Sequence, residues 1–591
     1  MTSLRARASA AVVVAVTAAS CGSERAPDGG EGEAAAPAAP VTMRFAERRE
    51  GSGVGFVDAH GREGRAKRHL PESMGGGVGL IDHDADGDLD LFLAGGDRWT
   101  DGERGDAQSS RLYRNDGAFR YRDVSDETGA SVRRDATAVA VGDVDADGFD
   151  DLFVAAHGPN VLLRNRGDGA FEDRSRDAGV DDDRYAAAAA FGDFDGDGDL
   201  DLYVGNYFVW DEAAVRLSEE GGSFRGHPVM AGPRGFVGAP DVLYANRSAD
   251  SGDLRFDDVT EAAGLSGSRS FALGAVVCDL DDDGDVDLYV ANDSEPNALF
   301  VNDGAMRFEE RALPAGAALS AVGQAQAGMG IVAQDLDGDE RADLFLTNFS
   351  HDTNTFYRNL GDLRFEDVTR RAGLATLSYL PLGFGVVAVD ADLDGDHDLA
   401  VANGHVFPSM DVHPANSRYA QPDQLLENLG DGRLREVDAP FGPSRAPAVS
   451  RGLAHGDLDG DGREDLVITT LNGSPSLLRN ETEGGRCVVV RLVGTASHPN
   501  AIGARVEADL DGPAGARRLV RRVVGGGSYM SASSRDLVFG LGARATVRSL
   551  RVRWPSGAVQ SVSSPPPGHL VVVTEGVETP ALAPLRRRAP E

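Results

Sequence analysis

Seven short acidic stretches contain the residues whose types and spacing could do chemistry. The first, DHDADGDLDLFL at residues 82–93, places five Asp residues within nine positions. Related stretches begin at residues 143, 193, 279, 335, 390 and 457. Numbered from the first Asp, every copy has Asp at positions 1, 3, 5 and 9 and Leu at position 10, whereas position 7 varies. Seven copies in one chain indicate a repeat architecture.

The spacing suits a hard divalent cation. Side chains at positions 1, 3, 5 and 9 can converge on one ion, and position 7 can offer its backbone carbonyl, which any residue type supplies. Oxygen-only ligands favour calcium over magnesium or transition metals, so we expect up to seven structural Ca²⁺ ions. The alternative is a set of solvated acidic turns, which the recurrence of four Asp in every copy disfavours. An EF-hand is excluded because position 12 holds an apolar residue in place of the bidentate Glu.

The candidate ligands occupy positions 1, 3, 5, 7 and 9 of the loops. In chain order they are Asp82, Asp84, Asp86, Asp88 and Asp90; Asp143, Asp145, Asp147, Phe149 and Asp151; Asp193, Asp195, Asp197, Asp199 and Asp201; Asp279, Asp281, Asp283, Asp285 and Asp287; Asp335, Asp337, Asp339, Arg341 and Asp343; Asp390, Asp392, Asp394, Asp396 and Asp398; and Asp457, Asp459, Asp461, Arg463 and Asp465. Glu340 replaces the Gly of position 6 in the fifth loop, which leaves calcium binding by that loop open.

Each acidic loop belongs to a unit of four strand-sized pieces. One piece runs into the loop, one leaves it, one ends at Asn (LYRN, 112–115), and one follows a turn (YRDVS, 121–125). Four antiparallel strands per unit predict an all-β, seven-bladed β-propeller over residues 42–482. The last unit lacks its fourth strand, and FAER (45–48) offers the missing piece, so we expect the N-terminal strand to close the ring.

Residues 483–577 differ in charge from the propeller. From residue 486 to the end, 15 Arg face 7 acidic residues, whereas the whole chain has a net charge of −37. Strand-like runs predict a small antiparallel β-sandwich followed by a tail, 578–591. Its basic surface could contact the acidic propeller, or it could bind an acidic partner, a lipid headgroup or a polysaccharide. The overall negative charge argues against nucleic acid as a partner.

The N-terminal 21 residues are typical of an export signal. A short basic region precedes the small apolar run ASAAVVVAVTAA (8–19), and Cys21 follows at AASC, which resembles a bacterial lipobox. We expect lipidation of Cys21 and a flexible linker at 22–41, giving a cell-envelope lipoprotein whose only membrane contact is the lipid; a secreted product is the alternative. The apolar run is too short to span a bilayer.

The acidic loops resemble the FG-GAP/VCBS repeats of integrin α-chain propellers, and Phe191-Gly192 before Asp193 matches the FG pair. That resemblance implies ions on one face, in the loop between the first two strands of each blade. The segments NAIGARV, GGGSYMSASSRDLVFGLG and VRWPSGAVQ resemble the ASPIC/UnbV domain. Together these features resemble bacterial relatives of cartilage acidic protein.

Three long connections between the second and third strands, in the first, third and sixth units, should lie on the calcium-free face. Long loops on one face favour binding of a protein or glycan ligand, as in an adhesion or assembly module. An alternative is a polysaccharide lyase or hydrolase with His405 or His413 as its base; a structural envelope protein is a third. No known catalytic motif supports an enzyme. The ligand-face candidates are Tyr207, Trp210, Arg225, His227, Asn403, His405, Asp411 and His413.

Overall fold

The structure is a computed structural model that describes residues 42–61, 67–100, 103–248, 253–266, 269–412, 417–443, 445–513 and 515–586. All of these residues belong to one unit, which begins at Val41. The predicted export signal, the linker, Cys21 and His413 lie outside the described residues. Among the described helices, none is long and apolar enough to cross a membrane.

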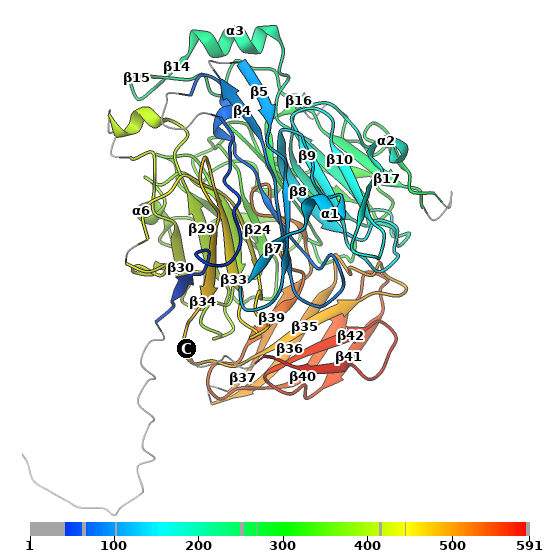
Figure 1. Ribbon diagram of the computed structural model, residues 1–591. Coiled ribbons are helices and arrows are strands. Elements are labelled where there is room, and N and C mark those ends of the chain that lie inside the picture. The colour runs from blue at the N-terminus through cyan, green and yellow to red at the C-terminus, as the bar shows by residue number, and fades with distance from the viewer. Residues whose placement is uncertain are drawn as a thin grey trace, which may run out of the picture. The chain divides into compact units, whose positions relative to one another are not determined.

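Seven sheets each contain four antiparallel strands contributed by the repeats (Figure 1). In chain order of their loops, the sheets are β2 (Val78–Ile81), β3 (Asp90–Leu93), β6 (Arg111–Asn115) and β7 (Tyr121–Asp123); β8 (Ala136–Gly142), β9 (Asp151–Ala156), β10 (Val161–Asn165) and β11 (Phe171–Asp173); β12 (Ala186–Gly192), β13 (Asp201–Asn206), β17 (Val242–Asn246) and β18 (Phe256–Asp258); β20 (Ala272–Cys278), β21 (Asp287–Asn292), β22 (Ala298–Asn302) and β23 (Phe308–Glu310); β24 (Ile331–Gln334), β25 (Asp343–Leu346), β26 (Thr355–Asn359) and β27 (Phe365–Asp367); β28 (Gly383–Val389), β29 (Asp398–Asn403), β30 (Gln424–Asn428) and β31 (Leu434–Glu436); and β32 (Ser450–Gly456), β33 (Asp465–Thr470), β34 (Ser476–Asn480) and β1 (Phe45–Glu47).

The remaining elements of the propeller are short and decorate these sheets. They are the helices η1 (Leu70–Ser73), α1 (Ser125–Thr128), α2 (Ser175–Ala178), α3 (Glu212–Glu220), α5 (Ala312–Ala315), α6 (Leu374–Leu377) and η2 (Pro408–Asp411), and the strands β4 (Asp97–Thr100), β5 (Glu103–Ala107), β14 (Gly222–Phe224), β15 (His227–Val229), β16 (Ala239–Pro240) and β19 (Arg269–Ser270). Figure 1 shows α3, β14 and β15 at the end of the propeller opposite the C-terminal domain.

The first strands of the seven sheets contact one another in a closed ring, β2–β8–β12–β20–β24–β28–β32 and back to β2. Small residues allow this close approach: β12 reads AAAAAFG, and a Cβ on Gly79 of β2 would lie 2.7 Å from Cγ1 of Val139 in β8. Strand β1 pairs with β34 and places Phe45 opposite Asn480. The predictions of an all-β fold and of an N-terminal strand that completes the last sheet are confirmed.

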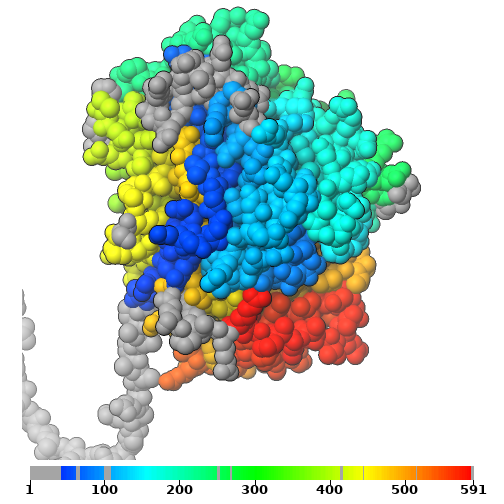
Figure 2. Space-filling model, viewed as in Figure 1, coloured from blue at the N-terminus to red at the C-terminus, as the bar shows by residue number. Residues whose placement is uncertain are grey.

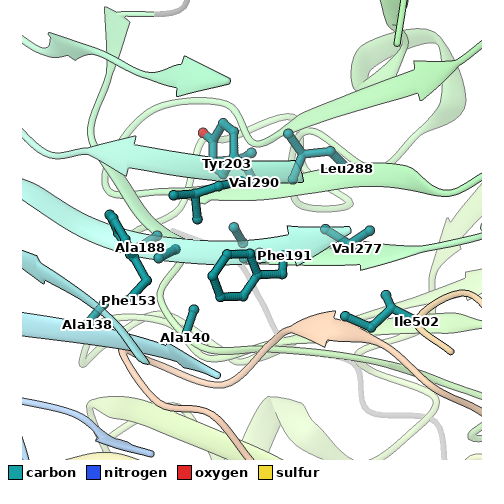
Figure 3. Close-up of a cluster of buried hydrophobic side chains, with 14 of the residues drawn as sticks. Ala138, Ala140, Phe153, Ala188, Phe191, Tyr203, Val277, Leu288, Val290 and Ile502 are labelled. Carbon is teal, nitrogen blue, oxygen red and sulfur yellow. The ribbon is translucent and has the colours of Figure 1, made fainter. Parts of the chain in front are cut away.

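The C-terminal domain consists of two four-stranded sheets. One contains β39 (Leu537–Gly540), β35 (Cys487–Val493), β42 (His569–Thr574) and β43 (Ala581–Pro584), and the other contains β37 (Gly515–Arg522), β36 (Arg505–Gly512), β40 (Thr546–Arg553) and β41 (Val559–Ser563). Side chains from both sheets share one buried cluster, which includes Trp554. The same cluster continues into the propeller, where Ile502 lies beside Phe191 and Val277 (Figure 3).

Two details of this domain differ from the prediction. Strands β35 and β42 pair in parallel, so the sandwich is not fully antiparallel. The parallel pair arises because β42 returns to the sheet after the whole second sheet has been formed, which is the crossover that parallel pairing requires. Residues 581–584, expected to be part of a tail, form β43 at the edge of the first sheet. The C-terminal domain is packed against one end of the propeller (Figure 2).

A glycine-rich segment of the C-terminal domain, residues 525–534, fills the centre of the propeller. We name this segment the plug. Its strand β38 (Gly525–Gly526) pairs with β20, Ser528 bridges to β24, and Ala532 bridges to β2. Met530 accepts a hydrogen bond from β8, and Ser528 Oγ donates to β32. The Tyr529 ring meets Phe384 of β28 at 4.9 Å, and a Cβ on Gly525 would lie 2.0 Å from a backbone oxygen of β12. The plug therefore touches all seven inner strands.

The far end of this channel is closed as well. The Tyr529 hydroxyl donates to the carbonyl of Met74, just after η1. Arg451 of β32 is fully buried, stacks on Phe384 at 4.0 Å, and donates to the carbonyls of Ser73 and Gly404. Its charge is satisfied by carbonyl oxygens and an aromatic face, as a buried guanidinium requires.

Closure by β1 gives the first prediction. Phe45 is 1% exposed and packs on Phe441 at 5.8 Å between ring centroids. Phe45→Ala should destabilise the protein by about 3–5 kcal/mol, since it removes a buried aromatic ring and weakens the last sheet. Thermal melting followed by circular dichroism measures the effect, with the exposed Thr42→Ala as control. Equal melting temperatures for the two variants would contradict closure by β1.

The plug gives the second prediction. A Cβ on Gly77 would lie 1.6 Å from the Met530 carbonyl oxygen, so Gly77→Ala must displace the plug. We expect a loss of about 1–3 kcal/mol, the usual cost of overpacking, together with faster proteolysis within 525–534. Gly55→Ala is the matched control, because a Cβ there meets nothing within 4 Å. A protected plug in Gly77→Ala would contradict this arrangement.

Candidate functional site

The seven acidic loops share one backbone geometry. In every loop the N–H of position 6 donates to the carboxylate at position 1, at 2.7–3.2 Å. The N–H of position 7 donates to the carboxylate at position 5, at 2.9–3.1 Å. Position 6 has a positive φ throughout, including Glu340 at 73° in the fifth loop. The fifth loop thus keeps the shared geometry at the cost of a conformation that favours glycine.

Position 9 is the buried anchor of each loop. All seven of these Asp residues are at most 2% exposed. One carboxylate oxygen accepts the N–H of position 2, which closes the loop across its base. The other accepts the N–H of the Asn that ends the third strand of the same sheet. Charge-assisted bonds of this kind fix the loop relative to the sheet.

The same seven Asn side chains join neighbouring sheets. Each donates from Nδ2 to the position 2 carbonyl of the preceding loop, at 2.8–3.0 Å, and Asn115 closes the ring by donating to Leu458 of the last loop. The LYRN-type pieces are therefore inter-blade clips. The sequence showed that they recur, but their role depends on contacts between units.

The donor set fits a calcium ion. Groups of carboxylate oxygens lie within 4.8 Å of one another in several loops, for example in Asp143, Asp145 and Asp151 and in Asp279, Asp281 and Asp287. Several of these oxygens are buried and have no hydrogen-bond partner among the described residues, including Oδ1 of Asp82 and of Asp193. Buried unpaired carboxylate oxygens are costly unless a cation is bound. A bound Ca²⁺ would take positions 1, 3 and 5 with oxygen ligands and neutralise their charge.

Burial raises the pKa of the carboxylates at position 1. The pKa rises to about 6 for Asp82 and Asp193 and to about 7 for Asp143, Asp279 and Asp457, with burial as the largest cause in each. Neighbouring loop carboxylates add to the effect through like-charge repulsion.

Arginines of the C-terminal domain lie against the acidic face. Ion pairs join Arg522 and Arg505 to Asp282 at 2.8 Å, Arg517 to Asp396 at 2.9 Å, Arg535 to Asp150 at 2.6 Å, and Arg586 to Asp88 at 2.6 Å. The basic surface is thus used within the chain, which is the first of the two predicted alternatives.

The opposite face holds a cavity of about 570 Å³. It is lined by residues of insertion 207–240 and by connections at residues 293–294, 325–329, 349–352 and 406–407. Aromatic rings gather here: Phe224 of β14 lies 5.6 Å from Phe349 and 5.7 Å from Phe407. Asp293, Asp352 and Arg234 add charged groups. An adjoining cavity of about 510 Å³ includes Lys67, Arg68 and Glu219 in its wall.

The hairpin β14–β15 carries the ring that reaches this cavity. Its two-residue turn consists of Arg225 and Gly226, with φ of 50° and 84°. Two positive φ values suit the right-handed twist of a tight hairpin, but they strain a non-glycine residue. Arg225 is exposed at the tip of the hairpin, next to Phe224.

Of the residues predicted to lie on the ligand face, some line the cavity and others do not. Tyr207 is buried and lines the cavity, where its hydroxyl donates to Asp293 at 2.6 Å. Arg225 lines the cavity too. His227 lies on the hairpin, and Trp210 packs edge-on against His69, His157 and Phe208, away from the cavity wall. Asp411 is exposed and accepts the Tyr419 N–H.

Two candidates turn out to be structural. Asn403 is fully buried and donates to the carbonyl of Pro422, so its placement on the ligand face was wrong. His405 is fully buried; its Nδ1 accepts the Phe407 N–H, and burial lowers its pKa to about 3. A fully buried imidazole with a lowered pKa and an engaged Nδ1 is poorly suited to act as a general base. The structure therefore disfavours the hypothesis of His405 as base.

Sequence reasoning missed Phe224, Phe349, Asp293 and Asp352. The last three lie in connections of ordinary length, so a search for long insertions passed over them. Phe224 lies within an insertion, but nothing in the sequence distinguishes it from a core residue.

Two protein-family models match this chain. The FG-GAP-like repeat model matches residues 82–154, 143–204, 279–346 and 335–401, and the ASPIC and UnbV model matches residues 494–580. The chain is an FG-GAP-repeat protein with a C-terminal ASPIC/UnbV domain. In carrying this domain pair it is similar to cartilage acidic protein 1 of several animals.

Curated relatives include cartilage acidic protein 1 of Mus musculus, 29% identical over 228 residues, and of Xenopus tropicalis, 26% identical over 340 residues. These alignments cover 36% and 55% of this chain and 34% and 48% of the relatives, so the match spans half or less of their length.

Similar solved structures include an Agrocybe aegerita lectin that recognises non-reducing terminal N-acetylglucosamine, with 16% identity, a TM-score of 0.36, and coverage of 67% of this chain and 85% of that one. Another is a Bacillus licheniformis rhamnogalacturonan lyase, with 13% identity, a TM-score of 0.34, and coverage of 71% and 75%. At these scores the likeness says nothing about a ligand or a reaction.

The raised carboxylate pKa values give the third prediction. The unfolded-state pKa of Asp is about 3.9, so protonation favours the folded state, and this contribution is lost as the pH rises through 6 to 7. Metal-free protein should therefore melt roughly 5 °C or more higher at pH 5.5 than at pH 7.5. Saturating CaCl₂ should remove or reverse this trend, because protons compete with the ion. Melts in 0.5 M NaCl control for general charge repulsion. A metal-free melting temperature that rises with pH would contradict the assignment.

Proposed function

We propose that the protein is an exported, calcium-stabilised, non-enzymatic binding module for adhesion or assembly. In this proposal the calcium ions are structural, and the cavity on the face opposite the acidic loops receives a group presented by a protein or glycan ligand at the cell envelope. The single observation that carries the proposal is the aromatic-lined cavity of about 570 Å³ beneath insertion 207–240. Its volume is in the range of specific small-ligand sites.

The cavity wall has the chemistry of a recognition site. The rings of Phe224 and Phe349 are partly exposed and can pack against the C–H faces of a sugar or an apolar side chain. Asp293 and Asp352, with Gln326 bonded to Asp352 at 2.7 Å, offer polar groups at fixed positions. Few convergent polar groups in an apolar cavity are typical of binding sites.

Two observations support binding rather than catalysis. The centre of the propeller is occupied by the plug, and the cavity that remains between the plug and the inner strands has a volume of about 110 Å³, which is smaller than a typical small-molecule site. His405 is neutral and engaged by a backbone N–H. The lyase or hydrolase alternative then requires a base elsewhere on the face, and His413 is outside the described residues.

The export part of the proposal rests on the sequence of the first 41 residues. A lipid on Cys21 would be the chain's only membrane contact, and a secreted product is the alternative. Mass spectrometry of the mature N-terminus, with Cys21→Ser as control, distinguishes an acylated cysteine from a free terminus.

The fourth prediction tests the cavity. A panel of neutral and uronic-acid oligosaccharides and a pull-down from envelope extract, each with calcium-loaded protein, identify the ligand. Phe349→Ala should then weaken binding by roughly tenfold or more, since it removes an aromatic contact. Val559→Ala, which changes an exposed residue of the C-terminal domain, is the control. Unchanged binding by Phe349→Ala and Phe224→Ala would place the ligand elsewhere, and turnover of an oligosaccharide would favour the enzyme.

A further inference from the structure

The acidic loops differ in how many oxygens of the position 1 carboxylate are hydrogen-bonded. In the first, third and fourth loops this residue is Asp82, Asp193 or Asp279. One oxygen accepts the position 6 N–H, at 3.0, 3.1 and 3.2 Å respectively. The other oxygen, Oδ1, is buried and has no hydrogen-bond partner among the described residues. These three loops thus present an unused buried ligand atom.

In the second, fifth and seventh loops both oxygens of position 1 are used. Asp143 accepts the N–H groups of Asp147 at 3.0 Å and of Gly148 at 2.8 Å. Asp335 and Asp457 each accept three backbone N–H groups, at 2.7–3.1 Å. In these loops, backbone N–H groups therefore engage both oxygens of the position 1 Asp, which is the residue expected to bind the ion.

The same three loops contain an arginine. Arg164, Arg358 and Arg479 stand at one repeat position, immediately before the inter-blade Asn. Each guanidinium pairs with the carboxylates at positions 3 and 5 of its own loop. The distances to position 5 are 2.8 Å for Arg164, 3.2 Å for Arg358 and 3.7 Å for Arg479, and Arg479 lies 2.6 Å from position 3. Arg164 and Arg358 also contact position 3, Asp145 and Asp337.

The equivalent position differs in the other blades. It is Ala245, Val301 and Glu427 in the third, fourth and sixth. The first blade has Arg114, but its guanidinium bonds to Asp116 at 2.9 Å instead of filling the loop. In the third loop Arg247 comes within 3.5 Å of Asp195 at position 3, and among the described residues no ion pair joins an arginine to Asp197 at position 5.

The sixth loop is a separate case. Its position 1 residue, Asp390, accepts the Gly540 N–H of the C-terminal domain at 2.9 Å as well as its own position 6 N–H, and the Arg521 guanidinium lies 3.7 Å from it. No ion pair between an arginine and positions 3 or 5 is found there in the part of the chain that the structure describes. A cation can therefore still reach Asp392 and Asp394.

We propose that Arg164, Arg358 and Arg479 take the place of the metal ion in the second, fifth and seventh loops, so that the protein binds at most four Ca²⁺. The inference rests on the proposed role of calcium. Each guanidinium pairs with one oxygen of position 3 and leaves the other, Oδ1 of Asp145, Asp337 or Asp459, buried without a hydrogen-bond partner among the described residues. The arginine supplies a permanent positive charge with a fixed fork of donors beside these carboxylates, so the charge that an ion would balance is already balanced. The first, third and fourth loops require an external cation, and the sixth can take one.

Calcium stoichiometry tests the inference. The full mature chain is stripped of metal and dialysed to equilibrium against CaCl₂ at 1–5 mM, and bound ions are counted with ⁴⁵Ca and by native mass spectrometry. We expect three or four ions per chain. More than four would overturn the inference while leaving calcium binding intact. No bound calcium would instead overturn the proposed calcium role, so the two failures are distinguishable.

A pair of reciprocal substitutions assigns the effect to the arginine position. Arg358→Val gives the fifth blade the residue of the fourth, and it should add one ion. Val301→Arg gives the fourth blade the residue of the fifth, and it should remove one. Circular dichroism of both variants confirms that they fold. If Arg358→Val fails to add an ion, Arg164→Ala provides a second trial in a loop that has Gly at position 6; an unchanged count in both overturns the inference.

Discussion

The structure depends on how carboxylate charge is balanced at one end of the propeller. Every repeat contributes at least four Asp residues to a single loop, and every loop lies at the same end of its sheet. The Asp at position 9 accepts hydrogen bonds from two backbone N–H groups, one from position 2 of its loop and one from the Asn that ends the third strand. This Asp therefore connects the loop to the third strand. The remaining charge has three partners: arginines of the propeller, arginines of the C-terminal domain, and, in our proposal, calcium.

This constraint explains why the C-terminal domain lies where it does. A basic domain on an acidic face reduces repulsion. Its arginines pair with loop residues such as Asp282 and Asp88, and Arg521 lies 3.7 Å from Asp390 at position 1 of the sixth loop. Surface ion pairs alone contribute little. The plug supplies the firmer attachment, because its backbone bonds to inner strands are buried. The contacts with the C-terminal domain thus lie at one end of the propeller, and in our proposal the other end, with its insertions, binds the ligand.

Much of this could be predicted from the sequence because the repeats encode it locally. The Asp spacing, the Asn at the end of each third strand and the missing fourth strand are all visible without coordinates, and they led to the all-β ring and to β1. The plug could not be predicted, because GGGSYMSASS has neither strand nor helix periodicity and its partners lie on all seven inner strands. The arginines that pair with the loop carboxylates could not be predicted either, because Arg114 and Arg164 occupy the same repeat position. Arg164 bonds to Asp147 in its loop, whereas Arg114 bonds to the neighbouring Asp116.

The errors on the ligand face have a common physical cause. Polar residues at the end of a strand serve either to satisfy buried backbone groups or to meet a ligand, and sequence type does not separate the two. Asn403 and His405 do the former, since a channel closed at that end by Arg451 needs its carbonyls and N–H groups satisfied. Phe349 and Asp293, in connections of ordinary length, line the cavity together with the insertion of another blade. The lining of this cavity comes from several blades and depends on how the insertions lie against their neighbours, which no single repeat encodes.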